Sequence, residues 1–197
     1  MRVISGKARG TILNSVESIT TRPTLDRVKE NVFNIIRGNI DENSVILDLF
    51  AGSGAIGIEF LSRGAKKAYF VDKDKNCVIQ INKNLEKTHL KDKAEVINSD
   101  YSSFLNNRLR EKIDIVYLDP PYKEKFLKEV IEIILKCDIL SKNGIIIVET
   151  DEEERDLQSL DEIKNNLERE NKRFSLEIYD RRKYGRVHLL FLRKEED

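Results

Sequence analysis

The sequence predicts an α/β protein with a doubly wound, Rossmann-like sheet that is mostly parallel and ends in an antiparallel strand. Strand-like and helix-like segments alternate from Ser44 onward. Two of the strand-like segments, VILDLF and IDIVYL, are almost continuously apolar, as in a parallel sheet that helices cover on both faces. A glycine-rich turn follows the first of them. Folds of this class bind ligands at the carboxyl ends of their strands, so the candidate site residues are expected there.

The elements before this alternation form an N-terminal part, residues 1–40. Arg2–Ser5 and Thr11–Asn14 alternate in polarity around two glycines, which predicts a short β-hairpin. Thr24 can cap a helix, because the apolar residues that follow it recur at helical spacing.

The elements of the core follow in a regular order. Strands are expected over residues 45–49, 68–71, 95–97, 113–118 and 145–149, with helices over 55–63, 76–89, 102–105 and 125–136. The charged segment 151–172 is expected to be helical. Residues 175–179 and 187–192 are expected to form an antiparallel pair of strands joined by the polar loop DRRKYGR. We expect a single domain, 1–197, in which residues 44–197 form the catalytic core.

The composition excludes several classes of protein. The chain has 197 residues, of which 40% are apolar and 36% charged, so it can bury a core without disulfides. No apolar run is long enough to cross a bilayer, and the first residues form no apolar signal segment, which predicts a cytoplasmic protein without a membrane partner. The two cysteines and two histidines, Cys77, Cys137, His89 and His188, do not have the spacing of a metal site. We therefore expect no metal.

The charged residues are unevenly distributed although the formal net charge is zero. Residues 1–40 carry a net charge of +4 and residues 172–194 a net charge of +6, whereas residues 151–170 carry −6. Such runs are commonly solvated faces. The two basic segments can also meet in one patch that binds phosphates.

The glycine loop in VILDLFAGSGAIGIEF is typical of a nucleotide or nucleoside site. Gly52, Gly54 and Gly57 lie between a strand and its helix, and Asp72 follows twenty residues after the first glycine, where a carboxylate can accept both ribose hydroxyls. This pattern fits NAD, FAD or S-adenosylmethionine. Residues 48–62 contain no basic side chain and begin with Asp48, which would repel a pyrophosphate and attract a sulfonium or an ammonium.

Two acidic residues, Asp48 and Asp100, also have possible roles that involve no ligand. Asp48 can simply accept hydrogen bonds from amides of the loop. Asp100, in the run VINSDY, can accept from an adenine amino group or cap the helix from Ser102 onward.

The tetrapeptide Asp119, Pro120, Pro121 and Tyr122 follows the strand IDIVYL. Two prolines fix an extended, rigid turn at the carboxyl edge of the sheet. Asp119 and the carbonyl of Pro120 can hold the two hydrogens of an exocyclic amino group, and Tyr122 can stack on a base. Transfer of a methyl group from a sulfonium then needs orientation and electrostatic preorganisation more than a strong base. A rigid loop that caps the next helix is the alternative.

The motifs DLFAGSGAIGIE, VDKD and LDPPY, in this order and spacing, resemble class I S-adenosylmethionine-dependent amino-methyltransferases. The pieces RVISGKARG, RPTLDRVKENVFN and YGRVHL are similar to the bacterial methyltransferases that modify the exocyclic N2 of a guanine in 16S ribosomal RNA. The resemblance covers nearly the whole chain and is weakest over residues 151–173. Ile12 departs from it, because this family often has a basic residue there.

The resemblance implies S-adenosylmethionine as the methyl donor, S-adenosylhomocysteine as the product, and 16S ribosomal RNA as the substrate. It implies cofactor contacts from Asp48, Phe50, Ala51, Gly52, Ser53, Gly54, Asp72, Asp100 and Tyr101. It implies a target-base pocket made by Asp119, Pro120, Pro121 and Tyr122. The residues expected to contact RNA are Lys7, Arg9, Arg22, Thr24, Arg27, Arg181, Arg182, Lys183 and Arg186. We expect a monomer that acts on naked RNA or within an assembling small ribosomal subunit.

Three other functions remain open from the sequence. An amino-methyltransferase of DNA adenine or cytosine, or of protein glutamine, would use a similar D-P-P-Y pocket. An NAD-linked oxidoreductase would use the glycine loop but would leave Asp48 and the tetrapeptide unexplained. A catalytically silent RNA-binding protein would need none of this chemistry.

Overall fold

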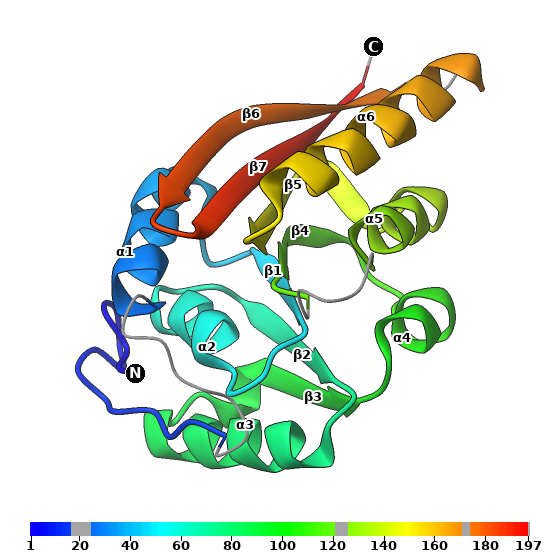
Figure 1. Cartoon of the computed structure of the whole chain (residues 1–197). Helices are drawn as coiled ribbons and strands as arrows, with labels where there is room; N and C mark the ends of the chain where they lie inside the picture. The colour runs from blue at the N-terminus through cyan, green and yellow to red at the C-terminus, as the bar shows by residue number, and fades with distance from the viewer. Residues whose placement is uncertain (17–24, 121–125, 171–173, 197) are drawn as a thin grey trace. The chain divides into compact units, whose positions relative to one another are not determined.

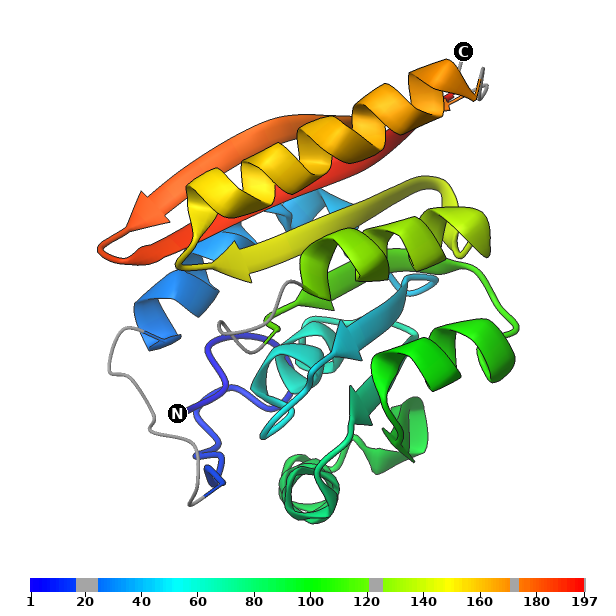
Figure 2. The same ribbon diagram turned by 45° about the vertical axis from the view of Figure 1, so that its right-hand side comes forward.

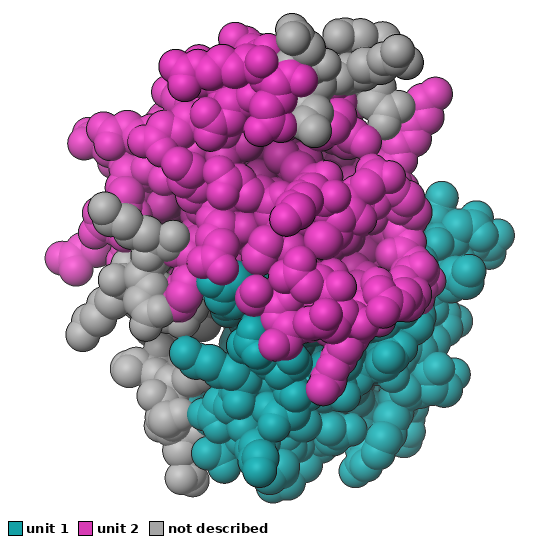
Figure 3. All heavy atoms as spheres, turned by 90° about the vertical axis from the view of Figure 1, so that its right-hand side faces the viewer, with its two compact units in different colours: residues 1–101 teal, residues 102–197 magenta. Residues whose placement is uncertain are grey.

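A computed structural model describes residues 1–16, 25–120, 126–170 and 174–196 of the chain (Figure 1). The predicted helix cap Thr24 lies outside these ranges. The chain divides into two compact units, residues 1–101 (unit 1) and residues 102–197 (unit 2), which Figure 3 distinguishes by colour. Our expectation of a single domain, with residues 1–40 as an appendage, stays a prediction. Across the described ranges, no helix combines the length and the apolar character needed to span a membrane.

Unit 1 contains a parallel sheet in the order β3-β2-β1. Its strands are β1 (Val45–Leu49), β2 (Lys67–Asp72) and β3 (Ala94–Asn98). Its helices are α1 (Leu25–Ile35), α2 (Ala55–Ser62) and α3 (Lys75–Thr88), with short 3-10 helices at Arg37–Asn39 and Lys91–Lys93. Every residue of β1 is buried, as expected for a strand covered on both faces. The strands β1 to β3 and the helices α2 and α3 confirm the predicted elements to within two residues, whereas the two 3-10 helices were not predicted.

The two arms of the predicted N-terminal hairpin meet antiparallel, but at a single β-bridge between Arg2 and Ile12, so the strands predicted over residues 2–5 and 11–14 are not formed. The amides of Val3 and Leu13 donate across the two arms, to the carbonyls of Thr11 and Met1 at 3.0 and 2.9 Å, whereas the next main-chain groups bind α2. The amides of Ile4 and Ser5 donate to the Glu59 carboxylate at 2.8 and 3.0 Å. The segment is therefore docked on a helix by hydrogen bonds that span about 55 positions of sequence.

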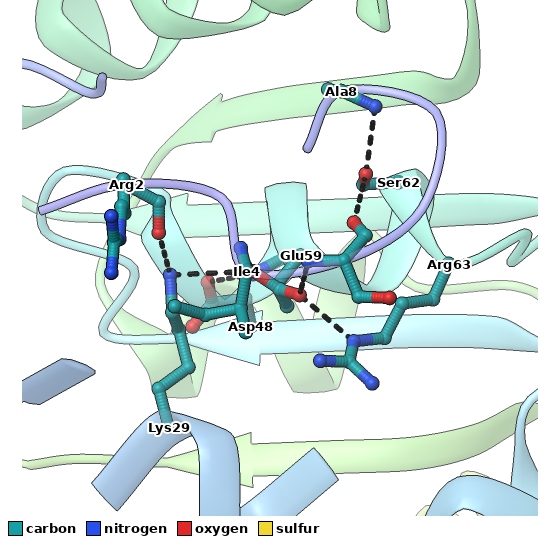
Figure 4. Close-up of polar contacts among 10 residues, drawn as sticks. Arg2, Ile4, Ala8, Lys29, Asp48, Glu59, Ser62 and Arg63 are labelled. Carbon is teal, nitrogen blue, oxygen red and sulfur yellow. Dashed lines mark hydrogen bonds and ion pairs between the residues drawn. The ribbon is translucent and has the colours of Figure 1, made fainter. Parts of the chain in front are cut away.

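The Glu59 carboxylate is the centre of this docking (Figure 4). It is completely buried and forms ion pairs with Lys29 at 3.3 Å and with Arg63 at 2.8 Å. The Lys29 ammonium also donates to the carbonyl of Arg2 at 2.6 Å. Burial lowers the pKa of Lys29, and the neighbouring Glu59 opposes that effect. A buried charge is tolerated when it is paired and hydrogen-bonded, as this carboxylate is.

Unit 2 contains four strands in the order β4-β5-β7-β6. The strands are β4 (Ile113–Leu118), β5 (Leu140–Thr150), β6 (Phe174–Tyr184) and β7 (Val187–Glu196). The helices are α4 (Tyr101–Asn107), which starts on the last residue of unit 1, α5 (Phe126–Lys136) and α6 (Glu153–Arg169). Strand β4 is parallel to β5, whereas β7 is antiparallel to both of its neighbours, which confirms the predicted change of direction. Helix α6 packs on β6 and beside α5 (Figure 2).

Three strands of unit 2 are longer than predicted: β5 begins at Leu140, before the predicted residue 145, β7 continues to Glu196, and β6 includes most of the segment DRRKYGR. Only Gly185 and Arg186 form the turn, and Gly185 has the positive φ, 66°, that a two-residue hairpin turn requires. Arg181 and Arg182 pair with residues of β7 in the sheet, and their guanidinium groups reach Glu153 and Asp180. Ion pairing on the exposed face lets a charged segment form a strand.

A glycine substitution tests the docking of the N-terminal segment. Gly6 has a φ of 82°, and a Cβ there would lie 1.8 Å from the main-chain oxygen of Ser62 on α2. Gly10 has a φ of 85° and open space around it, so it is a matched control. We expect Gly10→Ala to lower the free energy of unfolding by about 1 kcal/mol through backbone strain alone, and Gly6→Ala by at least about 2 kcal/mol more. Urea denaturation measures both, and equal losses would contradict the docking.

Candidate functional site

The turn after β1 bends sharply over the end of β2. The amides of Phe50 and Ala51 both donate to the carbonyl of Val71 at 3.0 Å. Phe50, Gly52 and Gly54 have positive φ values of 83°, 54° and 77°. Glycine adopts this conformation freely, but a phenylalanine there is strained, and such strain is concentrated at functional sites. The turn ends where α2 begins, so its amides are held at a helix N-terminus.

The third glycine of the motif serves packing. A Cβ at Gly57 would lie 2.3 Å from the ring of Phe70 on β2, so only glycine allows α2 to approach the sheet this closely.

The Asp72 carboxylate joins the end of β2 to the glycine loop. Its Oδ2 accepts from the amide of Gly52 at 2.8 Å, and its Oδ1 accepts from the amide of Asp74 at 2.9 Å. Asp72 is partly exposed, and each carboxylate oxygen has a second lone pair. The geometry thus leaves Asp72 able to accept hydroxyl groups. The spacing of twenty residues reflects a direct bond between the first glycine and this carboxylate.

The Asp48 carboxylate is buried at the end of β1. Its Oδ2 accepts from the amide of Gly57 at 2.9 Å. Burial raises the pKa of Asp48 to about 7, the bond to Gly57 opposes this shift, and the charge of Asp72 adds to it. The alternative role, a hydrogen bond to a loop amide, is therefore observed. Contact with a ligand stays a prediction for Asp48.

Further predicted cofactor residues come from the end of β3. The rings of Phe50 and Tyr101 lie with their centroids 5.7 Å apart. Asp100 is exposed and directly precedes α4. The side chain of Asn98 donates to the carbonyls of Asp72 and Lys73 at 3.0 Å, which ties the ends of β2 and β3 together. Unit 1 thus brings these predicted residues to the carboxyl ends of three neighbouring strands.

Asn84 is a site residue that the sequence reasoning missed. It lies on α3, is fully buried, and donates from Nδ2 to the carbonyl of Ser53 in the glycine loop at 2.9 Å. A polar residue on the apolar stripe of a helix, beside Ile81 and Leu85, is the signal that could have found it.

The other predicted residues are only partly described. Asp119 and Pro120 follow β4 directly and are partly exposed, whereas Pro121, Tyr122, Arg22 and Thr24 lie outside the described residues. The described residues expected to contact RNA are all exposed: Lys7, Arg9 and Arg27 in unit 1, and Arg181, Arg182, Lys183 and Arg186 in unit 2. Within the ranges that the structure describes, no three His, Cys, Asp or Glu side chains could hold a metal ion.

The arrangement in unit 1 suits one kind of ligand. Two carboxylates, Asp48 and Asp72, hold the loop, and residues 48–62 carry no basic side chain. A pyrophosphate would meet repulsion there, and a nucleoside with a cationic substituent would meet attraction.

Comparisons with a family model, with known sequences and with solved structures each match most of the chain. A family model described as "Conserved hypothetical protein 95" matches residues 1–193. The protein YlbH of Bacillus subtilis is 41% identical over 155 residues, 78% of this chain and 84% of that protein. Ribosomal RNA small subunit methyltransferase D of Haemophilus influenzae is 39% identical over 155 residues, 78% of this chain and 80% of that protein. A solved structure from Escherichia coli matches with a TM-score of 0.78 and 30% identity, covering 100% of this chain and 99% of its own, which confirms the predicted fold class.

The burial of Asp48 predicts a pH dependence of stability. Because its pKa is raised from 3.8 to about 7, the unfolded chain ionises this carboxyl at a lower pH than the folded chain does. Stability is therefore lost as the pH rises from about 4 to 7. Asp48→Asn keeps an acceptor for Gly57 and cannot ionise.

We expect the free energy of unfolding of Asp48→Asn, relative to the unsubstituted protein, to rise by about 2–3 kcal/mol between pH 5 and pH 8. Urea denaturation at both pH values measures the change. Asp92→Asn, at an exposed position, serves as the control. A difference that does not vary with pH would contradict the ionisation behaviour ascribed to Asp48.

Proposed function

The chain belongs to the family described as Conserved hypothetical protein 95, and on that premise we propose that it is an S-adenosylmethionine-dependent methyltransferase of small-subunit ribosomal RNA. The observation that carries the proposal is the loop of unit 1, held between the carboxylates of Asp48 and Asp72 without a basic side chain. The name of the Haemophilus influenzae relative supports the acceptor.

The residues of unit 1 would bind the cofactor through its polar and aromatic groups. Asp72 accepts the ribose hydroxyls with the lone pairs that Gly52 and Asp74 leave free. Phe50 and Tyr101 border the adenine, with Asp100 beside its amino group. Asp48 attracts the cationic end of the molecule. When bound, S-adenosylmethionine supplies an electrophilic methyl group on a sulfonium that leaves as a neutral thioether.

The residues that follow β4 would hold the acceptor. We propose that the acceptor is the exocyclic N2 of a guanine, whose lone pair is delocalised into the ring. Asp119 and the carbonyl of Pro120 accept hydrogen bonds from its two N–H groups and so favour a pyramidal, nucleophilic nitrogen. Once the N–CH3 bond has formed and the C–S bond has broken, the nitrogen loses one proton, to Asp119 or to solvent. Tyr122 stacks on the base, a contact of about 1–3 kcal/mol in nucleic-acid binding. Such a transfer needs orientation and electrostatic preorganisation more than a strong base, and it requires neither a metal nor a covalent intermediate on the protein.

The exposed basic residues would position the RNA through its phosphates. Lys7, Arg9 and Arg27 do so from unit 1. In unit 2, Arg181 and Arg182 would exchange their carboxylate partners, Glu153 and Asp180, for phosphates. The target guanine would have to leave its stack to enter the pocket. We further propose that the protein is a cytoplasmic monomer that can act on an assembling small subunit.

Incubation with methyl-labelled S-adenosylmethionine tests this function. The acceptors are unmodified small-subunit RNA, purified small subunits lacking the modification, and duplex DNA, each followed by nucleoside analysis. We expect label in N2-methylguanine from the RNA or the subunits. Label in DNA alone would overturn the RNA acceptor. Absence of label from every sample, together with absence of cofactor binding, would overturn the methyltransferase itself.

Two substitutions separate the proposed roles of the carboxylates. Asp119→Ala removes an acceptor for the target amine, so turnover should fall by about 100-fold or more while the Kd for S-adenosylmethionine stays within about twofold. Asp72→Ala removes the acceptor for the ribose, so that Kd should rise by about 10- to 100-fold. Calorimetry and the label assay measure both quantities. Asp92→Ala, at an exposed position, is the control.

The opposite pattern would contradict these assignments. Near-normal turnover in Asp119→Ala would show that Asp119 does not bind the target base. An unchanged Kd for S-adenosylmethionine in Asp72→Ala would show that Asp72 does not bind the ribose.

A further inference from the structure

Asn84 presents a buried side-chain amide with all of its hydrogen-bonding groups in use. The residue is completely buried on α3, among the apolar side chains Cys77, Ile81 and Leu85. A primary amide has two N–H donors and one carbonyl acceptor, and burial makes an unused donor or acceptor costly. The partners of Asn84 therefore determine what this position does.

The partners lie on two separate segments of unit 1. The amide of Asn14 donates to Oδ1 of Asn84 at 2.9 Å, and Nδ2 of Asn84 donates back to the carbonyl of Asn14 at 2.9 Å. The same Nδ2 donates to the carbonyl of Ser53 at 2.9 Å. Asn84 thus pairs with residue 14 as a neighbouring strand would, and it holds the glycine loop with its remaining donor. Gln80 adds a longer bond, 3.3 Å, to Oδ1.

The glycine loop is consequently fixed from two directions. The Asp72 carboxylate holds the amide of Gly52, and Asn84 holds the carbonyl of the next residue, Ser53. The bond from Asn84 to Ser53 therefore links any change in the position or the mobility of this loop to the Asn84 side chain. Because the same amide group binds both polar groups of Asn14, the change reaches the N-terminal segment.

The N-terminal segment carries basic residues proposed to bind RNA. Lys7 and Arg9 are exposed on it, between the part that docks on Glu59 and the part that binds Asn84. The amide of Ala8, between these two residues, donates to the hydroxyl of Ser62 at 2.9 Å (Figure 4). The segment is thus held at both ends, and the Asn84 side chain that fixes the end at residue 14 also binds the cofactor loop.

We propose that Asn84 is a positioning residue that couples cofactor binding to RNA binding, so that each ligand raises the affinity for the other. The inference rests on the proposed function, since it requires both ligands. A purely structural clamp would change stability, or both affinities independently. Coupling makes each affinity depend on the other ligand, and the two factors must be equal.

Binding measurements on the unsubstituted protein and on the variants Asn14→Pro and Asn14→Ala test the coupling. The Kd for an unmodified small-subunit RNA is measured with and without saturating S-adenosylhomocysteine, and the Kd for S-adenosylhomocysteine with and without that RNA. Asn14→Pro removes the amide that donates to Asn84 and leaves the bond from Asn84 to Ser53 in place. Asn14→Ala is the matched control, because both bonds of residue 14 come from its main chain and its side chain is exposed.

In the unsubstituted protein and in Asn14→Ala, we expect each ligand to lower the Kd of the other ligand about fivefold or more. In Asn14→Pro this factor should fall below about twofold, while the Kd for S-adenosylhomocysteine alone stays within about twofold of the unsubstituted value. A factor near one in the unsubstituted protein, or the same factor in Asn14→Pro, would overturn the proposal.

Backbone hydrogen exchange keeps the test independent of any folding defect in Asn14→Pro. In the unsubstituted protein, saturating S-adenosylhomocysteine should slow exchange of the Asn14 amide about threefold or more, because the bond to Asn84 opens less often. Unchanged exchange would overturn the coupling. If the unsubstituted protein binds the cofactor and methylates RNA while exchange and affinities stay uncoupled, this inference fails and the proposed function stands. If it binds no cofactor, both fail.

Discussion

Hydrogen bonds from backbone amides to two carboxylates hold the turn on which the candidate site of unit 1 depends. Asp48 binds the amide of Gly57, and Asp72 binds the amide of Gly52. Each bond joins the end of a strand to the glycine turn or to the first helical turn after it, so the turn has a defined shape before any ligand arrives. Asp72, together with Asp48 once its carboxyl ionises near pH 7, places negative charge beside a helix N-terminus, a position that usually receives a phosphate. This combination favours a nucleoside with a positive charge over a dinucleotide.

The helix that starts at this turn also carries the anchor of the N-terminal segment. Helix α2 begins at Ala55, directly after the glycine loop, and ends with Glu59 and Ser62, whose side chains bind the amides of Ile4 and Ala8 (Figure 4). One eight-residue helix therefore links the loop proposed to bind the cofactor with the segment proposed to bind RNA. Asn84 makes a second link between the same two parts, from α3. Under the coupling proposed above, the RNA binds best when the methyl donor is present.

The strands and helices of both units were largely predictable because their signals are local. Apolar strands bounded by glycine or polar residues predicted β1 and β4 without error, and the glycine spacing singled out Gly52 and Asp72, whose mutual hydrogen bond only the structure shows. The errors come from distant contacts. The N-terminal hairpin is shorter than predicted because Glu59, far away in the sequence, binds the amides of Ile4 and Ser5, so the arms pair only around Arg2 and Ile12. The segment DRRKYGR, predicted as a loop, extends β6 because Glu153 pairs with Arg181.

The role of Asn84 could not be predicted for the same reason. Its partners are main-chain groups of residues 14 and 53, and no short motif records such contacts. For Asp48, the sequence left two roles open, and the structure supplies the amide partner without excluding a ligand. The sequence is enough to predict a residue's role when its hydrogen-bond partners lie nearby in the chain, and it is not enough when they are brought together by tertiary packing.

The central claim is that the loop held by Asp48 and Asp72 accepts S-adenosylmethionine and rejects a dinucleotide. Two-dimensional amide NMR of the unsubstituted protein tests it most directly, with S-adenosylmethionine and NAD titrated separately to the same concentration. The account predicts saturable shifts at Gly52, Gly57 and Asp74 with S-adenosylmethionine and none with NAD. Shifts at these amides with NAD, and none with S-adenosylmethionine, would contradict it.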